Sequence, residues 1–420
     1  MTFQVNDMDI EQLNQQLAEL AKQTRRAIDS NDFSLAKQTI LNVLKMVPNH
    51  DIALADLAFV ESKLGNKEAA MTAAEQALQY SRKPIDPYIY DTLVSRANDL
   101  NRREEAFYYA KLAIKTKLEQ VKDKPYYPLP ARAAPGLSTD PAQNIISYSV
   151  FGAQPRYCEV AVLNAKLAKL IYPQWTCRFY VDQSVPENVV ERLRLNNAEV
   201  VYVNEEQQKI SGLFWRFFVM DDPRVRCFMV RDADSLLSFK EQAAVNEWLA
   251  SGKYFHVMRD GVGESELILA GMWGGYTGVF PNMQQIIRRH YAQIQVFNKT
   301  IDQYFLRELW PTISRSLCLH ESVQLQKGSL PFPDYELSDI EKIPYFHIGM
   351  VDAHLLHTRI DVEDPSAERI HWFLQDEHNN TVCHYIAAVP ESRVVTLYLP
   401  YFYSKRIQRQ EWTIKYHKAE

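Results

Sequence analysis

The first part of the chain carries hydrophobic residues at helical spacing, every third or fourth position, from residue 9 to about residue 119. Small residues recur at a longer interval, because Ala36, Ala70 and Ala106 lie 34 and 36 residues apart. Predicted breaks between helices fall at Asn31-Asp32, Gly65-Asn66 and Asn101-Arg102. A period of this length predicts repeated pairs of helices, with a plain helical bundle as the alternative.

From Asn144 onward, short apolar runs alternate with amphipathic stretches. The apolar runs predict strands at Asn144–Val150, Cys177–Val181, Glu199–Val203, Arg226–Val230 and Tyr254–Met258. The stretches between them predict helices at Cys158–Leu170, Pro186–Leu195, Gly212–Met220 and Lys240–Ala250. Such alternation predicts an α/β domain with a mostly parallel sheet flanked by helices. Sheets of this kind bind ligands outside the carboxyl ends of their strands.

The two patterns are separated by residues 121–141, which are rich in proline and predict a semi-extended linker. We therefore expect a helical repeat domain at 1–120 and an α/β domain at 142–420. Near the carboxyl end, Val382–Ala388 and Val394–Leu399 predict a β-rich extension. The tail from Tyr401 mixes aromatic and basic residues, which fits packing against the domain or, as an alternative, contact with an anionic membrane surface.

Composition narrows the class of protein. A chain of 420 residues exceeds one ordinary hydrophobic core, and 46% hydrophobic with 24% charged residues is typical of globular domains. A net charge of -5 argues against a nucleic-acid binder. Five scattered cysteines indicate reduced thiols. With no signal sequence and no apolar run near the length of about 20 residues that a membrane helix needs, we expect a cytoplasmic protein, with peripheral contact at the inner face of the membrane left open.

The strongest chemical signal is a pair of carboxylates that follows a predicted strand. The apolar run Cys227–Val230 leads into Arg231-Asp232-Ala233-Asp234-Ser235. In extended chain, residues i and i+2 share a face, so Asp232 and Asp234 would present their oxygens together. Mg²⁺ and Mn²⁺ prefer oxygen ligands and are usually held by one or two carboxylates plus substrate phosphates. Ordinary turn chemistry is the alternative reading.

These patterns resemble two known families. The 34-residue period resembles tetratricopeptide repeats, although the early Trp of that consensus is missing. The strand order with an Asp-x-Asp after a central strand resembles nucleotide-sugar-dependent glycosyltransferases of the GT-A fold. Over roughly residues 144 to 350, one family of bacterial and large-virus glycosyltransferases is similar in the motifs Trp215-Arg216-Phe217, Arg231-Asp232-Ala233-Asp234-Ser235, Glu247-Trp248-Leu249, Phe255–Asp260 and Gly271-Met272-Trp273-Gly274.

The resemblance implies roles for particular residues. Asp232 and Asp234 would hold Mn²⁺ or Mg²⁺ against the diphosphate of the donor, with His347 as a third ligand and His320, His354 and His357 as competing candidates. Residues expected to receive the nucleobase, ribose and phosphates of the donor are Ser149, Phe151, Gly152, Arg216, Arg231, Gly271, Trp273 and Gly274. The catalytic base would be Asp260 or Asp334, with Glu336 also of the right type.

Each of these residues also has a structural alternative. Phe151 and His347 would serve equally as core residues, the arginines as salt-bridge partners, and Asp260 as the ion-pair partner of Arg259. The glycine-rich segment from Gly271 would otherwise be a flexible turn.

The predicted function is metal-dependent transfer of a sugar from a nucleoside-diphosphate sugar to a surface polysaccharide, a lipooligosaccharide, a lipid-linked glycan or a protein. The repeats would bind a protein partner or mediate self-association. The alternative is an interaction scaffold with a degenerate nucleotide-sugar domain, because the stretch Gly261–Glu266 lacks a His that the family often carries there. A phosphotransferase is disfavoured, since the chain has no Walker-type loop.

Overall fold

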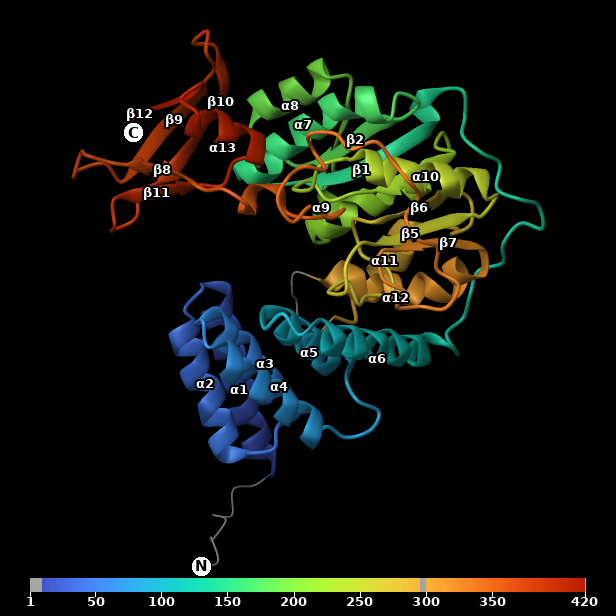
Figure 1. The fold of residues 1–420 in the computed structure, drawn as a ribbon, viewed down its shortest axis with the longest axis vertical. Coiled ribbons are helices and arrows are strands. Elements are labelled where there is room, and N and C mark those ends of the chain that lie inside the picture. Colours follow the sequence, from blue (N-terminus) through green and yellow to red (C-terminus); the bar gives the residue numbers. More distant parts are fainter. Residues whose placement is uncertain (1–9, 295–299, 420) are drawn as a thin grey trace, which may run out of the picture. The chain divides into compact units, whose positions relative to one another are not determined.

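A computed structural model describes residues 10–294 and 300–419 (Figure 1). The chain divides into two compact units. The first contains the residues up to Asp123 together with segments 261–267 and 323–327. The second contains 124–260, 268–322 and the residues from Gly328 onward.

The first unit is built from helical pairs of the tetratricopeptide-like kind. Its helices are α1 (Ile10–Asp29), α2 (Phe33–Met46), α3 (Asp51–Lys63), α4 (Lys67–Tyr80), α5 (Pro87–Asp99) and α6 (Arg103–Val121). Contacts join α1 to α2, α3 to α4 and α5 to α6, and also link successive pairs. The first helix of each pair is followed by a left-handed residue, Asn31 (φ 59°), Gly65 (φ 86°) or Asn101 (φ 57°). These residues interrupt the helices where the sequence predicted breaks.

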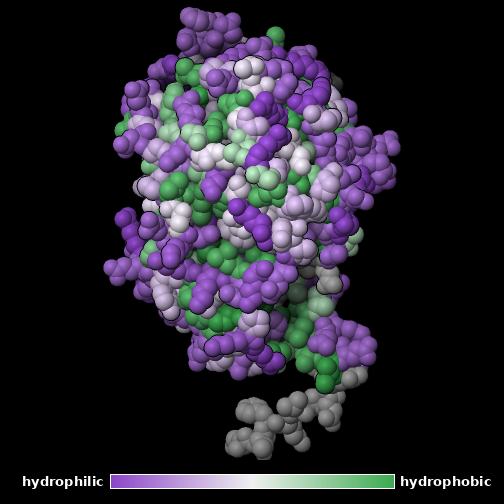
Figure 2. All heavy atoms as spheres, turned by 90° about the vertical axis from the view of Figure 1, so that its right-hand side faces the viewer, coloured by the Kyte–Doolittle hydropathy of each residue, from purple (hydrophilic) through white to green (hydrophobic). Residues whose placement is uncertain are grey.

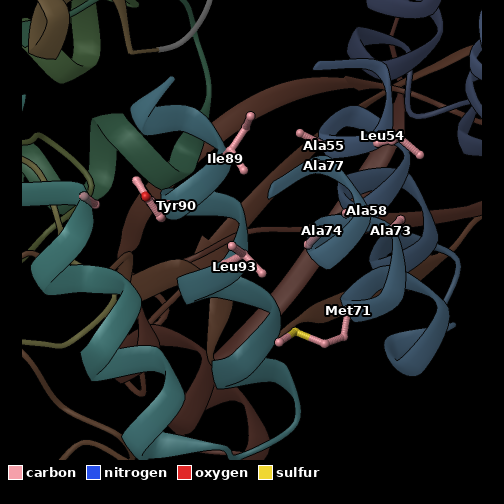
Figure 3. Packing of buried hydrophobic residues seen from close by; sticks show 11 residues of the cluster. Leu54, Ala55, Ala58, Met71, Ala73, Ala74, Ala77, Ile89, Tyr90 and Leu93 are labelled. Carbon is pink, nitrogen blue, oxygen red and sulfur yellow. The ribbon is translucent and has the colours of Figure 1, made fainter. Parts of the chain in front are cut away.

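Small residues form the core of the helical pairs. Ala36, Ala70 and Ala106, which defined the period in the sequence, are completely buried on the second helix of each pair. One hydrophobic cluster joins four helices, α3 to α6, through Leu54, Ala55, Ala58, Met71, Ala73, Ala74, Ala77, Ile89, Tyr90, Leu93 and Ala113 (Figure 3). Because alanine dominates this cluster, the backbones of α3 and α4 approach closely.

The second unit contains a seven-stranded sheet with the order β3-β2-β1-β4-β6-β5-β7. Its strands are β1 (Asn144–Val150), β2 (Thr176–Val181), β3 (Glu199–Tyr202), β4 (Cys227–Val230), β5 (Phe255–Arg259), β6 (Trp273–Tyr276) and β7 (Leu317–Glu321). Only β6 runs antiparallel to its neighbours β4 and β5; the other pairings in this sheet are parallel. The predicted mostly parallel sheet is confirmed.

Helical segments precede and connect these strands. They are η1 (Pro141–Gln143), α7 (Pro155–Ile171), α8 (Glu187–Leu195), α9 (Glu205–Gln208), η2 (Gly212–Asp221), α10 (Phe239–Ala250), α11 (Met283–Tyr291), α12 (Ile301–Ile313) and η3 (Ser314–Ser316). The α7 helix contacts β1 and β2, η2 contacts β1 and β4, and α10 contacts β5. The predicted helix at Gly212–Met220 is therefore a 3₁₀ segment, η2.

The chain order reverses between β1 and β4. From β1 the chain proceeds outward through β2 and β3, and β4 then pairs with the opposite edge of β1. Because β1 and β4 are parallel, their carboxyl ends lie toward the same edge of the sheet; Val230, the last residue of β4, is aligned with Ser147, and β1 continues to Val150. In open α/β sheets this reversal leaves a crevice outside the carboxyl ends of the strands, where ligands bind.

The carboxyl-terminal region forms two further small sheets. Strands β9 (Arg369–Gln375), β10 (Thr381–Ala388) and β12 (Thr413–Lys418) form one, and β8 (Thr358–Asp361) with β11 (Val394–Leu397) forms the other. Glu159 of α7, fully buried, accepts hydrogen bonds from Arg192 of α8 and Tyr385 of β10, which attaches the first sheet to those helices. The short segment η4 (Asp352–His354), which comes before β8 in the chain, contacts the helix α13 (Tyr401–Gln408).

Aromatic residues of the linker and the tail pack against the second unit. Tyr127 meets Phe280 edge to face, with ring centroids 5.5 Å apart, and Tyr126 lies against the guanidinium of Arg315. In the tail, Tyr403 is buried and its ring centroid lies 5.1 Å from that of Trp412. Packing, the favoured interpretation of these aromatic residues, is what the structure shows.

Candidate functional site

The two carboxylates of the Asp-x-Asp segment lie directly after β4, at the edge where β1 also ends. The side chain of Asp232 is 40% exposed, whereas Asp234 is buried. Burial raises the pKa of Asp234, and the negative charge of Asp232 raises it further, while Arg156 opposes the shift. The two carboxylates therefore repel each other, and a cation at this place would relieve the repulsion.

Arg216 of η2 holds Asp232 from one side. Its guanidinium donates to Asp232 and, at 2.7 Å, to Asp302, and the Arg216 side chain is only 6% exposed. The backbone N–H of Arg216 donates to the Ser149 hydroxyl at 2.9 Å. Through these bonds Arg216 of η2 joins the end of β1, at Ser149, to the segment after β4, at Asp232.

Asp302, in the first turn of α12, was not among the residues that the sequence predicted for the site. It is buried, and burial raises its pKa, while the neighbouring Arg216 opposes that shift. No local motif surrounds it in the sequence, and it meets Arg216 across 86 positions of chain. A buried carboxylate of this kind fixes the orientation of the arginine that it pairs with.

A second arginine that the sequence analysis missed holds Asp234. Arg156, in the first turn of α7, donates from Nη2 to Asp234 Oδ2 at 2.8 Å. Its Nη1 lies 3.1 Å from Nε2 of His354, which the sequence had considered as a metal ligand. Each carboxylate of the pair therefore has its own arginine.

Gly271 is required by the close approach of Asp232. A Cβ at Gly271 would lie 2.0 Å from Asp232 Oδ2 and 2.9 Å from the Asp232 backbone nitrogen, closer than real Cβ contacts come. In contrast, Trp273 and Gly274 lie in β6 within the core of the sheet, where the ring of Trp273 is fully buried between Phe217 and Phe228. The structure gives these two residues packing roles in place of the predicted ligand contacts.

The residues after β1 lie toward the same edge of the sheet as the carboxylate pair. Phe151 is 42% exposed, and its ring meets Trp215 edge to face at 5.6 Å, so it is not a core residue. The backbone N–H of Gly152 donates to the Ser184 hydroxyl at 2.6 Å, which fixes the loop. An exposed aromatic ring on a fixed loop is a suitable surface for stacking a nucleobase.

Arg231 is placed differently from its predicted role. Its guanidinium is buried, donates to Glu241 at 2.7 Å, and also donates to the carbonyls of Val230 and Trp273. These contacts make Arg231 a structural residue of the core in place of the predicted phosphate ligand, because its donors already have partners inside the protein.

The two candidate catalytic bases differ in environment. Asp260 is buried, accepts from Lys240 Nζ at 2.6 and 2.7 Å, and accepts from the backbone N–H of Ile348 at 2.8 Å. The predicted ion-pair partner Arg259 instead pairs with Glu321 at 3.2 Å. Asp334 is exposed in an irregular segment after β7.

His347 does not join the carboxylates. It is exposed, and its Nδ1 lies 3.2 Å from the carbonyl of Tyr345. Within residues 10–294 and 300–419, no group of three or more His, Cys, Asp or Glu side chains is arranged to hold a metal ion. If a cation bound here, Asp232 and Asp234 would be its donors from the described part of the chain. Two carboxylates fit a Mg²⁺ or Mn²⁺ ion whose other ligands are water and substrate phosphates.

Known structures resemble parts of this chain. The TPR2B domain of yeast Sti1, solved with pHsp70, is 14% identical over 25% of this chain and 82% of its own, with a TM-score of 0.24. The first TPR domain of human RPAP3 is 13% identical over 24% and 78%, with a TM-score of 0.23. A mutant O-GlcNAc transferase of Thermobaculum terrenum is 14% identical over 62% of this chain, with a TM-score of 0.32, and this chain spans about half (55%) of that protein.

No protein-family model and no curated protein matches the chain. In the part of the chain that the structure describes, no helix has both the length and the apolar composition needed to cross a membrane. The face shown in Figure 2 mixes hydrophilic and hydrophobic residues.

Proposed function

We propose that this protein is a metal-dependent glycosyltransferase with a GT-A-type α/β domain, which transfers a sugar from a nucleoside-diphosphate sugar to a surface polysaccharide, a lipooligosaccharide, a lipid-linked glycan or a protein. The observation that carries this proposal is the position of Asp232 and Asp234 after β4, beside the end of β1. Carboxylates at this reversal of the sheet are well placed to meet the diphosphate of a bound nucleotide.

The residues around the pair would divide the work of binding. When bound, Mn²⁺ or Mg²⁺ would neutralise charge on the departing nucleoside diphosphate. Phe151 would stack on the nucleobase, and Arg216 would keep Asp232 oriented through its bond to the buried Asp302. Asp260 already holds Lys240, so the role of catalytic base falls more readily to the exposed Asp334.

The test is release of nucleoside diphosphate from a panel of UDP- and GDP-sugars in the presence of Mn²⁺. Asp232→Asn and Asp234→Asn should each lower turnover about 100-fold or more, because several kcal/mol of charge stabilisation would be lost. Asp222→Asn is a matched control, since Asp222 also pairs with an arginine, Arg178 at 3.0 Å, but lies ahead of β4. Unchanged turnover in both site variants would refute the proposal.

A second candidate is an interaction scaffold in which the α/β domain no longer binds a nucleotide sugar. It is favoured by the ion pairs that Asp232 and Asp234 form within the chain, because such pairs also occur in purely structural sites. The helical pairs would then bind a protein partner or a second copy of the chain. A wild-type protein that is not stabilised by any nucleoside diphosphate with Mn²⁺, yet captures a defined partner through residues 10–121, would support this alternative.

A further inference from the structure

The two arginines at the carboxylate pair differ in how firmly they are held. Arg216 is 6% exposed and donates to Asp232, to Asp302 and to the carbonyl of Arg231. Arg156 is 26% exposed and has one carboxylate partner, Asp234. Arg216 is therefore fixed by the core, whereas Arg156 can exchange its partner by rotating its own side chain.

The remaining contacts of Arg156 are weak for a charged group. Its Nη1 lies 3.1 Å from the His354 ring, its guanidinium lies 4.5 Å from the centroid of the Tyr157 ring, and its buried Nε has no hydrogen-bond partner. A guanidinium in its best position would use its donors in a bidentate pair. Nε of Arg216 also has no hydrogen-bond partner, so the difference between the two arginines is that Arg156 has one carboxylate partner and Arg216 has two.

Arg156 and a divalent cation would compete for the same atom. Oδ2 of Asp234 accepts from Arg156, and the Asp234 side chain is only 12% exposed, so this oxygen has limited room for another positive group. A cation that binds both carboxylates would displace the guanidinium and repel it. An anion that arrives with the cation removes this penalty, because phosphate oxygens accept the guanidinium fork.

The position of Arg156 in the chain favours the same exchange. It occupies the first turn of α7, a helix of 17 residues that follows β1 at the reversal of the sheet. Helix amino termini carry partial positive charge and favour phosphate groups. A short rotation away from Asp234 would keep the guanidinium in a region that attracts anions.

We propose that Arg156 couples the binding of the two ligands: it pairs with Asp234 in the conformation described here, and it transfers to a phosphate of the nucleoside diphosphate when a divalent cation binds Asp232 and Asp234. Cation and diphosphate then bind cooperatively, and the cation alone binds weakly. This inference rests on the proposed function, because it takes a nucleoside diphosphate as the anion.

The test compares Arg156→Gln with the wild type in two titrations. Mn²⁺ alone is titrated by electron paramagnetic resonance of the free ion, and UDP, GDP, ADP, CDP and dTDP are titrated by calorimetry at saturating Mn²⁺. Arg156→Gln should bind Mn²⁺ about fivefold to tenfold more tightly. In this variant Mn²⁺ does not have to break the partly exposed ion pair between Arg156 and Asp234, and breaking such a pair lowers an affinity by up to about tenfold. The same variant should bind the active nucleotide about tenfold or more weakly.

Two further variants make these opposite shifts diagnostic. Arg224→Gln removes an arginine whose side chain is 75% exposed and pairs with Asp222, so both affinities should stay at the wild-type value. Arg156→Lys keeps the charge but not the fork, so Mn²⁺ should bind close to the wild-type affinity while the nucleotide binds more weakly. Thermal unfolding of each variant checks that it is folded.

The alternatives predict other outcomes. If Arg156 only supports the fold, Arg156→Gln weakens both ligands, and if it only binds phosphate, the Mn²⁺ affinity does not change; either result overturns the coupling. If wild-type protein binds none of the five nucleotides with Mn²⁺, the proposed function fails, whatever the Mn²⁺ titration shows. Nucleotide binding combined with an unchanged Mn²⁺ affinity in Arg156→Gln refutes the coupling alone.

Discussion

Substituting Gly271 by alanine tests the geometry of the carboxylate site most directly. The added methyl carbon would lie 2.0 Å from Oδ2, 2.4 Å from Cγ and 2.9 Å from the backbone nitrogen of Asp232. Real Cβ atoms stay beyond 3.0 Å from such neighbours, so Oδ2 would have to retreat by about 1 Å. The carboxylate can rotate, but the backbone contact remains, so the loop before β6 must also shift.

The size of the effect follows from these contacts. Overpacking of this kind costs about 1–3 kcal/mol of folding free energy. The rotated carboxylate would lose its hydrogen bond to Arg216 and its orientation beside Asp234. Misorienting a metal ligand lowers metal affinity by about 10-fold to 100-fold. Since tenfold in affinity is about 1.4 kcal/mol, Gly271→Ala should lose about as much free energy in Mn²⁺ binding as in stability.

The assay pairs urea denaturation, followed by tryptophan fluorescence, with Mn²⁺ titration. Gly263→Ala is the control, because a Cβ there would meet only Asn98 Nδ2, at an ordinary 3.5 Å, and its stability should stay within about 0.5 kcal/mol of wild type. A Gly271→Ala protein that binds Mn²⁺ as tightly as wild type would show that Asp232 does not act from this position.

Three other substitutions probe the surrounding structure. Asp302→Ala leaves the buried Arg216 with one carboxylate and should destabilise the protein by about 3 kcal/mol, measured from the urea midpoint; a loss under about 1 kcal/mol would contradict the assigned pairing. Ala70→Leu should lower the melting temperature, because this completely buried position has no room for a longer side chain, and an unchanged value would mean that the helices can separate freely. Burial and the neighbouring His320 hold the pKa of His256 well below 6.5, so the stability that neutral His256 supports is present above pH 6.5 and is lost as the pH falls. The change in unfolding free energy between pH 7.5 and 5.0 should therefore be smaller in His256→Gln than in the wild type, by up to about 1.4 kcal/mol per pH unit. Equal slopes in the two proteins would show that protonation of His256 does not set the pH dependence.

Much of the fold was predictable because its signals are local. The predicted strand Asn144–Val150 coincides with β1, and the other predicted strands of the main sheet lie within one residue of the observed bounds. Buried parallel strands are continuous apolar runs between turn residues, so their ends are marked in the sequence. The helical pairs were marked in the same way by small residues and by left-handed turn residues at a regular interval.

The helix predicted at Gly212–Met220 is present as η2, but its 3₁₀ type was not predictable, because the sequence there carries no periodicity. Every residue from Phe214 to Met220 is buried, so the segment has no polar face that would distinguish an α-helix from η2. The small carboxyl-terminal sheets were also left open, since strands appended to the main sheet and strands in a separate sheet have the same alternating pattern. The hydrogen bond from Tyr385 to Glu159, which attaches one of these sheets to α7, joins residues 226 positions apart.

The end of β4 explains why Arg231, one of the two arginines predicted to meet phosphates, lies away from the carboxylate pair that follows it. Arg231 directly follows the fully buried strand β4, whereas residues 233–235 form a turn, so the two carboxylates are carried by the turn and not by a shared strand face. The structure places Arg231 in the core against Glu241 accordingly. Positive charge at the carboxylates must then come from other elements, and Arg156 lies 78 positions from Asp234 in the chain. Such a pairing depends on the strand order, and only the fold brings it together.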